Sequence, residues 1–177
     1  MIDLFKFAAA NQGQLGVVVV NCGVRHVWEL VLKQSGYRVP VIGGGRLADG
    51  YVVTPEVKRD LVCHSKEHHK LTVCAFGDSA LDIEMLLAAD HAVVVTGRHE
   101  SNCVEKDLTE AVEQRGLMAH QVLPPHTEEP GLDVEALPTM KPDEPSFRKL
   151  LDRQIAMHDL SVSDTSASKY WQRLPGI

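Results

Sequence analysis

The sequence predicts an α/β fold, a three-layer sandwich built around a mainly parallel sheet. Three apolar, β-branched runs support this prediction: "GVVVVNCG" (16–23), "KLTVCAFG" (70–77) and "HAVVVTG" (91–97). Runs that are apolar throughout are typical of strands buried on both faces, as in parallel sheets. Helical patterns separate these runs along the chain, and strands that alternate with helices favour a parallel sheet.

Two helices are predicted in the first part of the chain. Residues 3–12 form the first, which ends at "NQGQLG". Residues 24–36 form the second, with Gly36 as its C-cap glycine. Apolar residues recur there at helical spacing, at Val24, Val27, Leu30 and Val31.

The stretch 39–54 is expected to form two short strands joined near Asp49–Gly50, a dipeptide typical of hairpins. Thr54 and Pro55 then open a helix that runs to about Lys66. Thr suits the N-cap, and Pro suits the first helical position because its missing N–H is not needed there.

The rest of the chain is expected to hold a helix at 79–89, a helix at 105–116 ended by Gly116, and a last helix at 146–160. Six of the nine prolines fall in a segment after Leu123, which is typical of an irregular linker. We therefore predict a core, a Pro-rich linker and a C-terminal helix with a tail, over residues 1–122, 123–145 and 146–177.

Composition excludes several classes of protein. The net charge of −6 argues against nucleic-acid binding driven by bulk charge. No apolar run approaches the roughly 20 residues that span a bilayer, and the first residues lack the pattern of a signal peptide. The four cysteines show no CxxC spacing, so we expect reduced thiols, a cytoplasmic location and Cys74 as a small core residue.

The stretch "FGDSALD" (76–82) raises the main functional question. Gly77 allows a sharp turn after a buried strand, and Asp78 follows at the start of a helix. Asp78 is either an N-cap, favoured by the helix dipole, or a ligand for Mg²⁺, which prefers carboxylate oxygen and water. Asp82 shares the helix face four residues later, which an N-cap alone does not require. This favours the metal site.

Lys58 and Asn21 are candidates for binding a phosphate. Lys58 lies in the first turn of its helix, where the dipole opposes a cation, so it is either solvated or held there to neutralise an anion. Asn21 ends a buried strand, and its side chain, with the backbone N–H groups of Cys22 and Gly23, could hold a phosphate oxygen. The alternative for Asn21 is an ordinary turn.

Two further patterns are weaker. "IGGGR" (42–46) lacks the GK[ST] ending of a phosphate loop and precedes extended chain, so its glycines indicate a flexible or bulged strand. His64, His68 and His69 approach i,i+4 spacing without an HExxH motif. A solvated helix end is the favoured interpretation for them.

In order along the chain, "VVVVN", Lys58 and "GDSALD" resemble motifs of the haloacid dehalogenase (HAD) superfamily of phosphohydrolases, and "GGGRLADGYVVTPEVK" is similar to its phosphoserine-phosphatase-like members. The resemblance covers roughly residues 14–116. It implies a HAD-like, Rossmannoid fold with Mg²⁺ bound by Asp78. It also implies phosphate contacts from Asn21, Cys22 and Lys58, and a catalytic role for Lys58 supported by Asp82.

The family's first motif, DxDx[TV] after an apolar strand, is not found. Asp3 has neither a preceding strand nor a second Asp two residues later. The first strand, which in the family lies between those of the second and fourth motifs, and the cap are therefore expected to be missing. Asp164, in a circularly permuted strand, could supply the nucleophile. The two flanking strands could instead pair directly, or a partner chain could supply the strand.

The chain also resembles the HAD-like segment of fungal multidomain proteins that carry a uracil-phosphoribosyltransferase-like domain. The first expectation is a HAD-like domain with a degenerate active site, a pseudoenzyme that binds Mg²⁺ and a phosphorylated or anionic small molecule. The alternatives are a non-catalytic dimerisation or partner-binding module, and a repurposed enzyme doing metal-independent acid/base chemistry in a biosynthetic pathway. A homodimer fits these expectations; nucleic-acid and membrane partners do not.

Overall fold

The structure is a computed structural model of the 177-residue chain. It describes residues 2–11, 14–44, 50–96, 106–110, 114, 116–123, 132–135, 137–140, 149 and 152. The described residues through Thr54 form one compact unit, and those from Pro55 onward form another. This division differs from the expected boundaries after residues 122 and 145. Each unit is described by itself.

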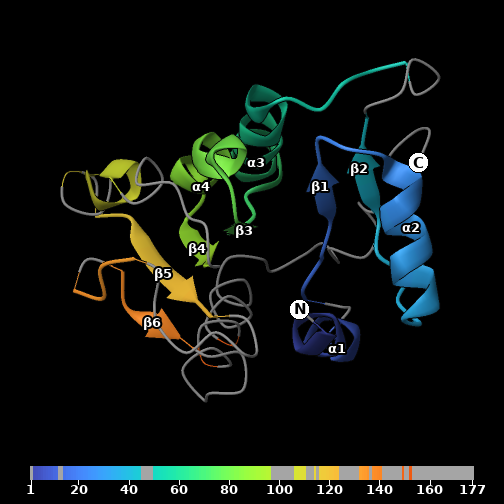
Figure 1. The fold of residues 1–177 in the computed structure, drawn as a ribbon, viewed down its shortest axis with the longest axis horizontal. Coiled ribbons are helices and arrows are strands. Elements are labelled where there is room, and N and C mark those ends of the chain that lie inside the picture. The colour runs from blue at the N-terminus through green and yellow to red at the C-terminus, as the bar shows by residue number, and fades with distance from the viewer. Residues whose placement is uncertain are drawn as a thin grey trace. The chain divides into compact units, whose positions relative to one another are not determined.

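The first unit contains, among its described residues, two helices and a two-stranded parallel sheet (Figure 1). Its elements, in chain order, are α1 (Ile2–Ala10), β1 (Val19–Asn21), α2 (Arg25–Gln34) and β2 (Val41–Gly43). The strands pair with Val19 opposite Val41. Phe5 and Leu32 pack with Val41 in the core, and the Phe5 ring centre lies 5.3 Å from that of Tyr37.

The hairpin predicted for residues 39–54 is wrong. β2 pairs with β1 as a parallel neighbour, so it is not one strand of an antiparallel hairpin. Residues 51–54 belong to no strand, and Asp49 lies outside the described residues. A Cβ added at Gly44 would lie 2.4 Å from the backbone oxygen of Tyr51, so the chain folds back here through close backbone contact.

β1 and α2 are less buried than their sequence patterns suggest. The residues of β1 are half-buried and not enclosed on both faces. The helix predicted at 24–36 is confirmed as α2, and Gly36 follows it with a φ of +79°. Its buried residue is Leu32, whereas the apolar residues that indicated the helix are exposed: Val24, Val27, Leu30 and Val31.

The second unit is built on a four-stranded sheet in which every neighbouring pair is parallel, in the order β3-β4-β5-β6. Its elements are α3 (Pro55–His69), β3 (Cys74–Gly77), the 3-10 turn η2 (Ala80–Asp82), α4 (Ile83–Ala88), β4 (His91–Val95), β5 (Met118–Val122) and β6 (Thr139–Met140). The predicted α/β class with a mainly parallel sheet is confirmed, and α3 begins at Pro55 as expected.

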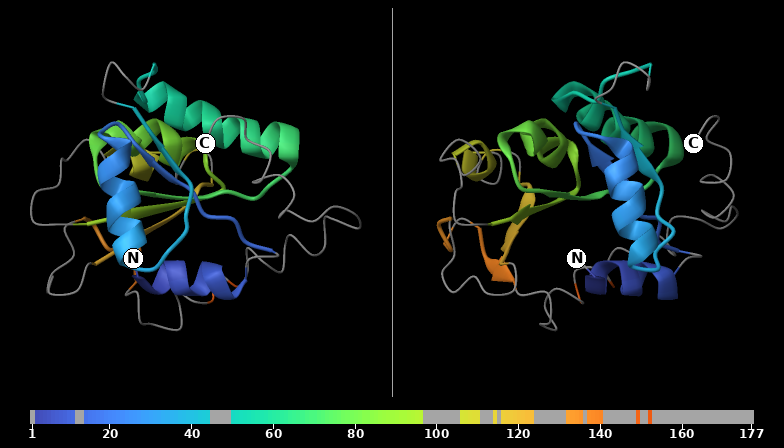
Figure 2. Two further views of the ribbon diagram at one scale, coloured as in Figure 1. Left: turned by 90° about the vertical axis from the view of Figure 1, so that its right-hand side faces the viewer. Right: turned by 45° about the vertical axis from the view of Figure 1, so that its right-hand side comes forward.

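α3 and α4 lie side by side over one face of this sheet (Figure 2). Residues 106–110 are helical and add Leu108 to the same layer, and Gly116 has the positive φ expected after a helix, +66°. The opposite face of the sheet is also buried, at Val93, as a three-layer arrangement requires. The shared core under the helices contains Val62, Ala75, Met85, Leu86, Ala92, Val94, Leu108 and Ala119.

The linker predicted for residues 123–145 is wrong where the structure describes that segment. Thr139 and Met140 form β6, which pairs with β5. The buried side chain of Gln121 donates hydrogen bonds from Nε2 to the carbonyl oxygens of Leu132 at 3.1 Å and Leu137 at 2.8 Å. Both leucines are buried in the core. The described residues of this segment are therefore packed onto the sheet.

The two strands that carry the predicted site motifs belong to separate sheets. Among the described residues, β1 pairs with β2 and β3 pairs with β4. Within the part of the chain that the structure describes, none of the helices has the length and apolar character to cross a bilayer.

Candidate functional site

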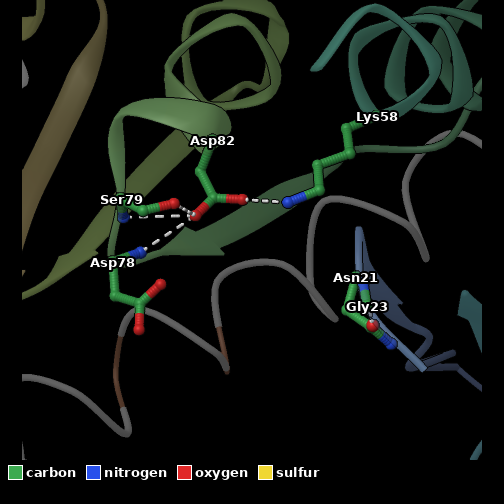
Figure 3. Close-up of polar contacts among 6 residues, drawn as sticks. All are labelled: Asn21, Gly23, Lys58, Asp78, Ser79 and Asp82. Carbon is green, nitrogen blue, oxygen red and sulfur yellow. Dashed lines mark hydrogen bonds and ion pairs between the residues drawn. The ribbon is translucent and has the colours of Figure 1, made fainter. Parts of the chain in front are cut away.

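Lys58 and Asp82 form a buried ion pair at the carboxyl end of β3 (Figure 3). The Lys58 Nζ lies 2.6 Å from Asp82 Oδ1. Lys58 is 5% exposed and Asp82 is 6% exposed, so both charges are removed from bulk water. The cost of burying both charges is offset by their mutual attraction and by further hydrogen bonds to them.

The second carboxylate oxygen of Asp82 organises the turn after β3. Its Oδ2 accepts hydrogen bonds from the backbone N–H groups of Asp78 and Ser79, each at 3.2 Å, and from the Ser79 hydroxyl at 2.8 Å. A Cβ added at Gly77 would lie 2.5 Å from the Asp82 Cβ. The turn therefore needs glycine at position 77, and Asp82 is committed to Lys58 and the turn.

Asp78 is placed differently from what the sequence suggested. The N-cap of η2 is Ser79, which forms a capping box with Asp82. The Asp78 side chain is exposed and points away from the Asp82 carboxylate (Figure 3). The expectation of two carboxylates sharing one cation on a helix face is therefore wrong, because the Asp82 carboxylate turns inward to Lys58. Asp78 is left as an outward-facing carboxylate at the strand end.

The described residues around Asp78 offer few protein ligands for a metal ion. No set of three or more His, Cys, Asp or Glu side chains among the described residues is arranged to hold a metal ion. Mg²⁺, however, often keeps several waters and takes only one or two carboxylates together with substrate phosphate oxygens. As an outward-facing carboxylate, Asp78 is suited to be that single protein ligand.

Lys58 retains capacity for an anion. Its ammonium group has three N–H donors, and Asp82 is its one hydrogen-bond partner among the described residues. Lys58 lies at this position because Pro55 starts α3 and Lys58 follows three residues later, within the first helical turn. An ammonium held in place by a buried carboxylate is pre-organised to contact a phosphate oxygen.

Asn21 and Cys22 belong to the first unit. Asn21 Oδ1 accepts a hydrogen bond of 2.7 Å from the backbone N–H of Gly23, which is the turn-forming interaction. That N–H is therefore not available to a phosphate, contrary to the expectation from the sequence. The buried Nδ2 of Asn21 has no hydrogen-bond partner among the described residues, and it packs against the bare backbone of Gly43. Cys22 is a half-buried free thiol.

Thr96, at the end of β4, does not add to the site. Thr96 is buried and donates a 3.4 Å hydrogen bond to the carbonyl oxygen of Val122, a role within the sheet. Asp164, the candidate nucleophile, lies outside the described residues. The role of Ser79 was not predicted, although the S-x-x-D spacing of "SALD" resembles the signal of a capping box.

Two titratable groups of the same sheet are perturbed. Burial raises the pKa of the Cys74 thiol to about 12. By surface exposure Cys74 is half-buried and is not among the buried core residues, which differs from the expectation of a small core residue. Burial, and to a smaller extent the neighbouring His91, lowers the pKa of His120. In each residue burial disfavours the charged form, the thiolate of Cys74 and the imidazolium of His120, because charge is costly away from water.

No protein-family model matches the chain, and neither a curated protein nor a solved structure is similar enough to count as a match.

Proposed function

We propose that the chain is a HAD-like domain with a degenerate active site, which binds Mg²⁺ together with a phosphorylated or other anionic small molecule. The observation that carries this proposal is the buried Lys58–Asp82 pair beside the outward-facing Asp78. Asp82 holds the Lys58 ammonium, which contacts the anion. Asp78 supplies the carboxylate for Mg²⁺.

Metal and anion depend on each other in this proposal. One carboxylate binds Mg²⁺ weakly, because the hydrated ion loses water reluctantly. A phosphate bound near Lys58 would supply further oxygen ligands, so each ligand strengthens the binding of the other. Covalent hydrolysis needs an activated nucleophile, which the sequence does not provide in the family's position. We therefore propose that the site binds the metal and the anion, and we do not propose hydrolysis.

The contributions of Asn21 and Cys22 stay predictions. A cytoplasmic location, with reduced thiols, also stays a prediction. Among the described residues, Cys22, Cys63 and Cys74 are free thiols.

The experiment is a calorimetric titration of inorganic phosphate in the presence of Mg²⁺, with wild type, Asp78→Asn and Asp60→Asn. Asp60 is a matched control, because it is an exposed aspartate on α3 whose partner is Arg59. We expect binding in wild type and Asp60→Asn, and at least about tenfold weaker binding in Asp78→Asn, because the neutral amide is a poorer ligand for a hard cation. Equal affinity in the three proteins would contradict the proposal.

A second candidate is a non-catalytic module that binds a partner chain or a second copy. The observation that favours it is β1, which has β2 as its one strand neighbour among the described residues. Isolated two-stranded sheets are marginally stable, and an open strand edge favours association. Sedimentation at several protein concentrations tests it, and a monomer throughout would exclude the homodimer. Metal-independent acid/base chemistry stays a prediction.

A further inference from the structure

Three histidine rings gather near the C-terminal end of α3, away from the residues used above. The ring centre of His64 lies 4.5 Å from that of His68 and 5.2 Å from that of His69. All three side chains are exposed. His64 and His68 are four residues apart, so they lie on one face of the helix, one turn from each other.

We propose that His64 and His68 form a surface site for a divalent late first-row transition ion, of the class of Ni²⁺, Cu²⁺ and Zn²⁺. Imidazole is a preferred ligand of these ions, and two histidines at i and i+4 of a helix can bind one ion together. The site is a chelating pair, completed by water.

The spacing of the rings suits this pair. A metal–nitrogen bond of about 2.0–2.1 Å places the centre of an imidazole ring roughly 3.2 Å from the ion. Two rings at about 90–110° around the ion then have centres about 4.5–5.2 Å apart. The observed 4.5 Å between His64 and His68 falls within that range. Exposed side chains turn about their bonds within nanoseconds, so small adjustments are not a barrier.

The surroundings also favour a cation. The rings lie in the last turn or two of a helix of 15 residues, where the backbone carbonyls give a partial negative charge. Lys66, a nearby cation on the same helix, is neutralised by Asp90, with 2.9 Å between Nζ and Oδ1. His69 is placed edge-on to His64, and the described residues provide no three-ligand set, so two histidines define the site.

The test is a calorimetric titration of Ni²⁺ into the untagged protein under reducing conditions. Ni²⁺ is the probe because thiolates, which select Zn²⁺ and Cu(I), compete less for it. We expect one site in wild type, and at least about tenfold weaker binding in His64→Ala and in His68→Ala, because each loses the chelate. His26→Ala is the matched control, since His26 is an exposed histidine on a helix with Glu29 as its neighbour. Its affinity should equal that of wild type.

A second readout locates the ion. In a nuclear magnetic resonance spectrum, sub-stoichiometric paramagnetic Ni²⁺ should broaden amide signals around His64 and His68 first. Lowering the pH should release the ion, because protons compete for the imidazole nitrogens. Failure of wild type to bind Ni²⁺, unchanged affinity in both alanine variants, or broadening centred elsewhere would each overturn the proposal. The Asp78 proposal is independent of this outcome, because it concerns Mg²⁺ and phosphate.

Discussion

The Lys58 ammonium and the Asp82 carboxylate lie 2.6 Å apart, and both residues are almost completely buried. The pair joins the first turn of α3 to the turn that follows β3. A buried ion pair contributes little net stability compared with apolar residues, whereas removing one partner leaves an uncompensated charge. A pair in this place is therefore better explained by the positioning of a charged group than by stability alone.

Substituting either member of the pair should destabilise the protein. Asp82→Ala removes the partner of Lys58 and the acceptor for two backbone N–H groups, so we expect a loss of about 3–5 kcal/mol in the free energy of unfolding. Lys58→Met should cost less, because Ser79 and the turn still satisfy the carboxylate. Urea unfolding measures both. Arg59→Met, which removes a partly exposed cation on the same helix, should stay within about 0.5 kcal/mol of wild type.

Gly77→Ala should disturb the same turn by overpacking. The added Cβ would meet the Asp82 side chain at 2.5 Å, and Asp82 cannot move without losing Lys58. We expect a loss of about 1–3 kcal/mol in urea unfolding, together with weaker phosphate binding. Gly36→Ala provides the comparison, because its Cβ meets nothing within 4 Å and its cost is backbone strain. Phosphate binding unchanged in Gly77→Ala would show that the turn does not shape the site.

The free energy of unfolding should decrease as the pH is lowered, because of His120. Burial lowers the pKa of His120 in the folded protein below its unfolded value of about 6.5. The unfolded chain therefore binds more protons as the pH falls below that value, and the free energy of unfolding decreases from there through the folded pKa. His120→Gln should show a smaller decrease between about pH 7 and pH 5 in urea unfolding. Parallel curves for both proteins would rule out this contribution.

The raised pKa of Cys74 should protect it from alkylation. With a pKa of about 12, only on the order of 10⁻⁴ of the thiol is thiolate at pH 8, and the thiolate is the reactive form. Iodoacetamide at pH 8, followed by mass spectrometry of the peptides, should modify Cys74 at least about a hundredfold more slowly in the folded protein than in urea. Comparable rates in the two states would contradict this burial.

Local patterns predicted the elements whose signals are complete within one segment. Pro55 marks the start of α3, Gly36 follows the end of α2, and the apolar runs before Gly77 and after Asp90 became β3 and β4. These signals depend on backbone preferences and burial, which the sequence shows directly. The Lys58–Asp82 association was expected from the family resemblance, and the structure brings the two residues together.

Features set by distant contacts were not predictable in this way. The Asp49–Gly50 dipeptide suggested a hairpin, but the pairing of Val41 with Val19 determined where β2 lies. β6 was not predicted in the Pro-rich segment, because the residue that holds this segment by hydrogen bonds, the buried Gln121, lies on another strand. Asp78 and Asp82 have the same chemistry, and the serine between them, together with Lys58, decides which one turns inward.

The measurement that tests the central claim most directly is the affinity of wild type for Mg²⁺ with and without saturating inorganic phosphate, by calorimetry. The proposed site predicts weak binding of Mg²⁺ alone and at least about fivefold tighter binding with phosphate, since coupled ligands strengthen each other. The same gain should be absent in Asp78→Asn. An identical affinity for Mg²⁺ with and without phosphate would contradict a shared site at Asp78 and Lys58.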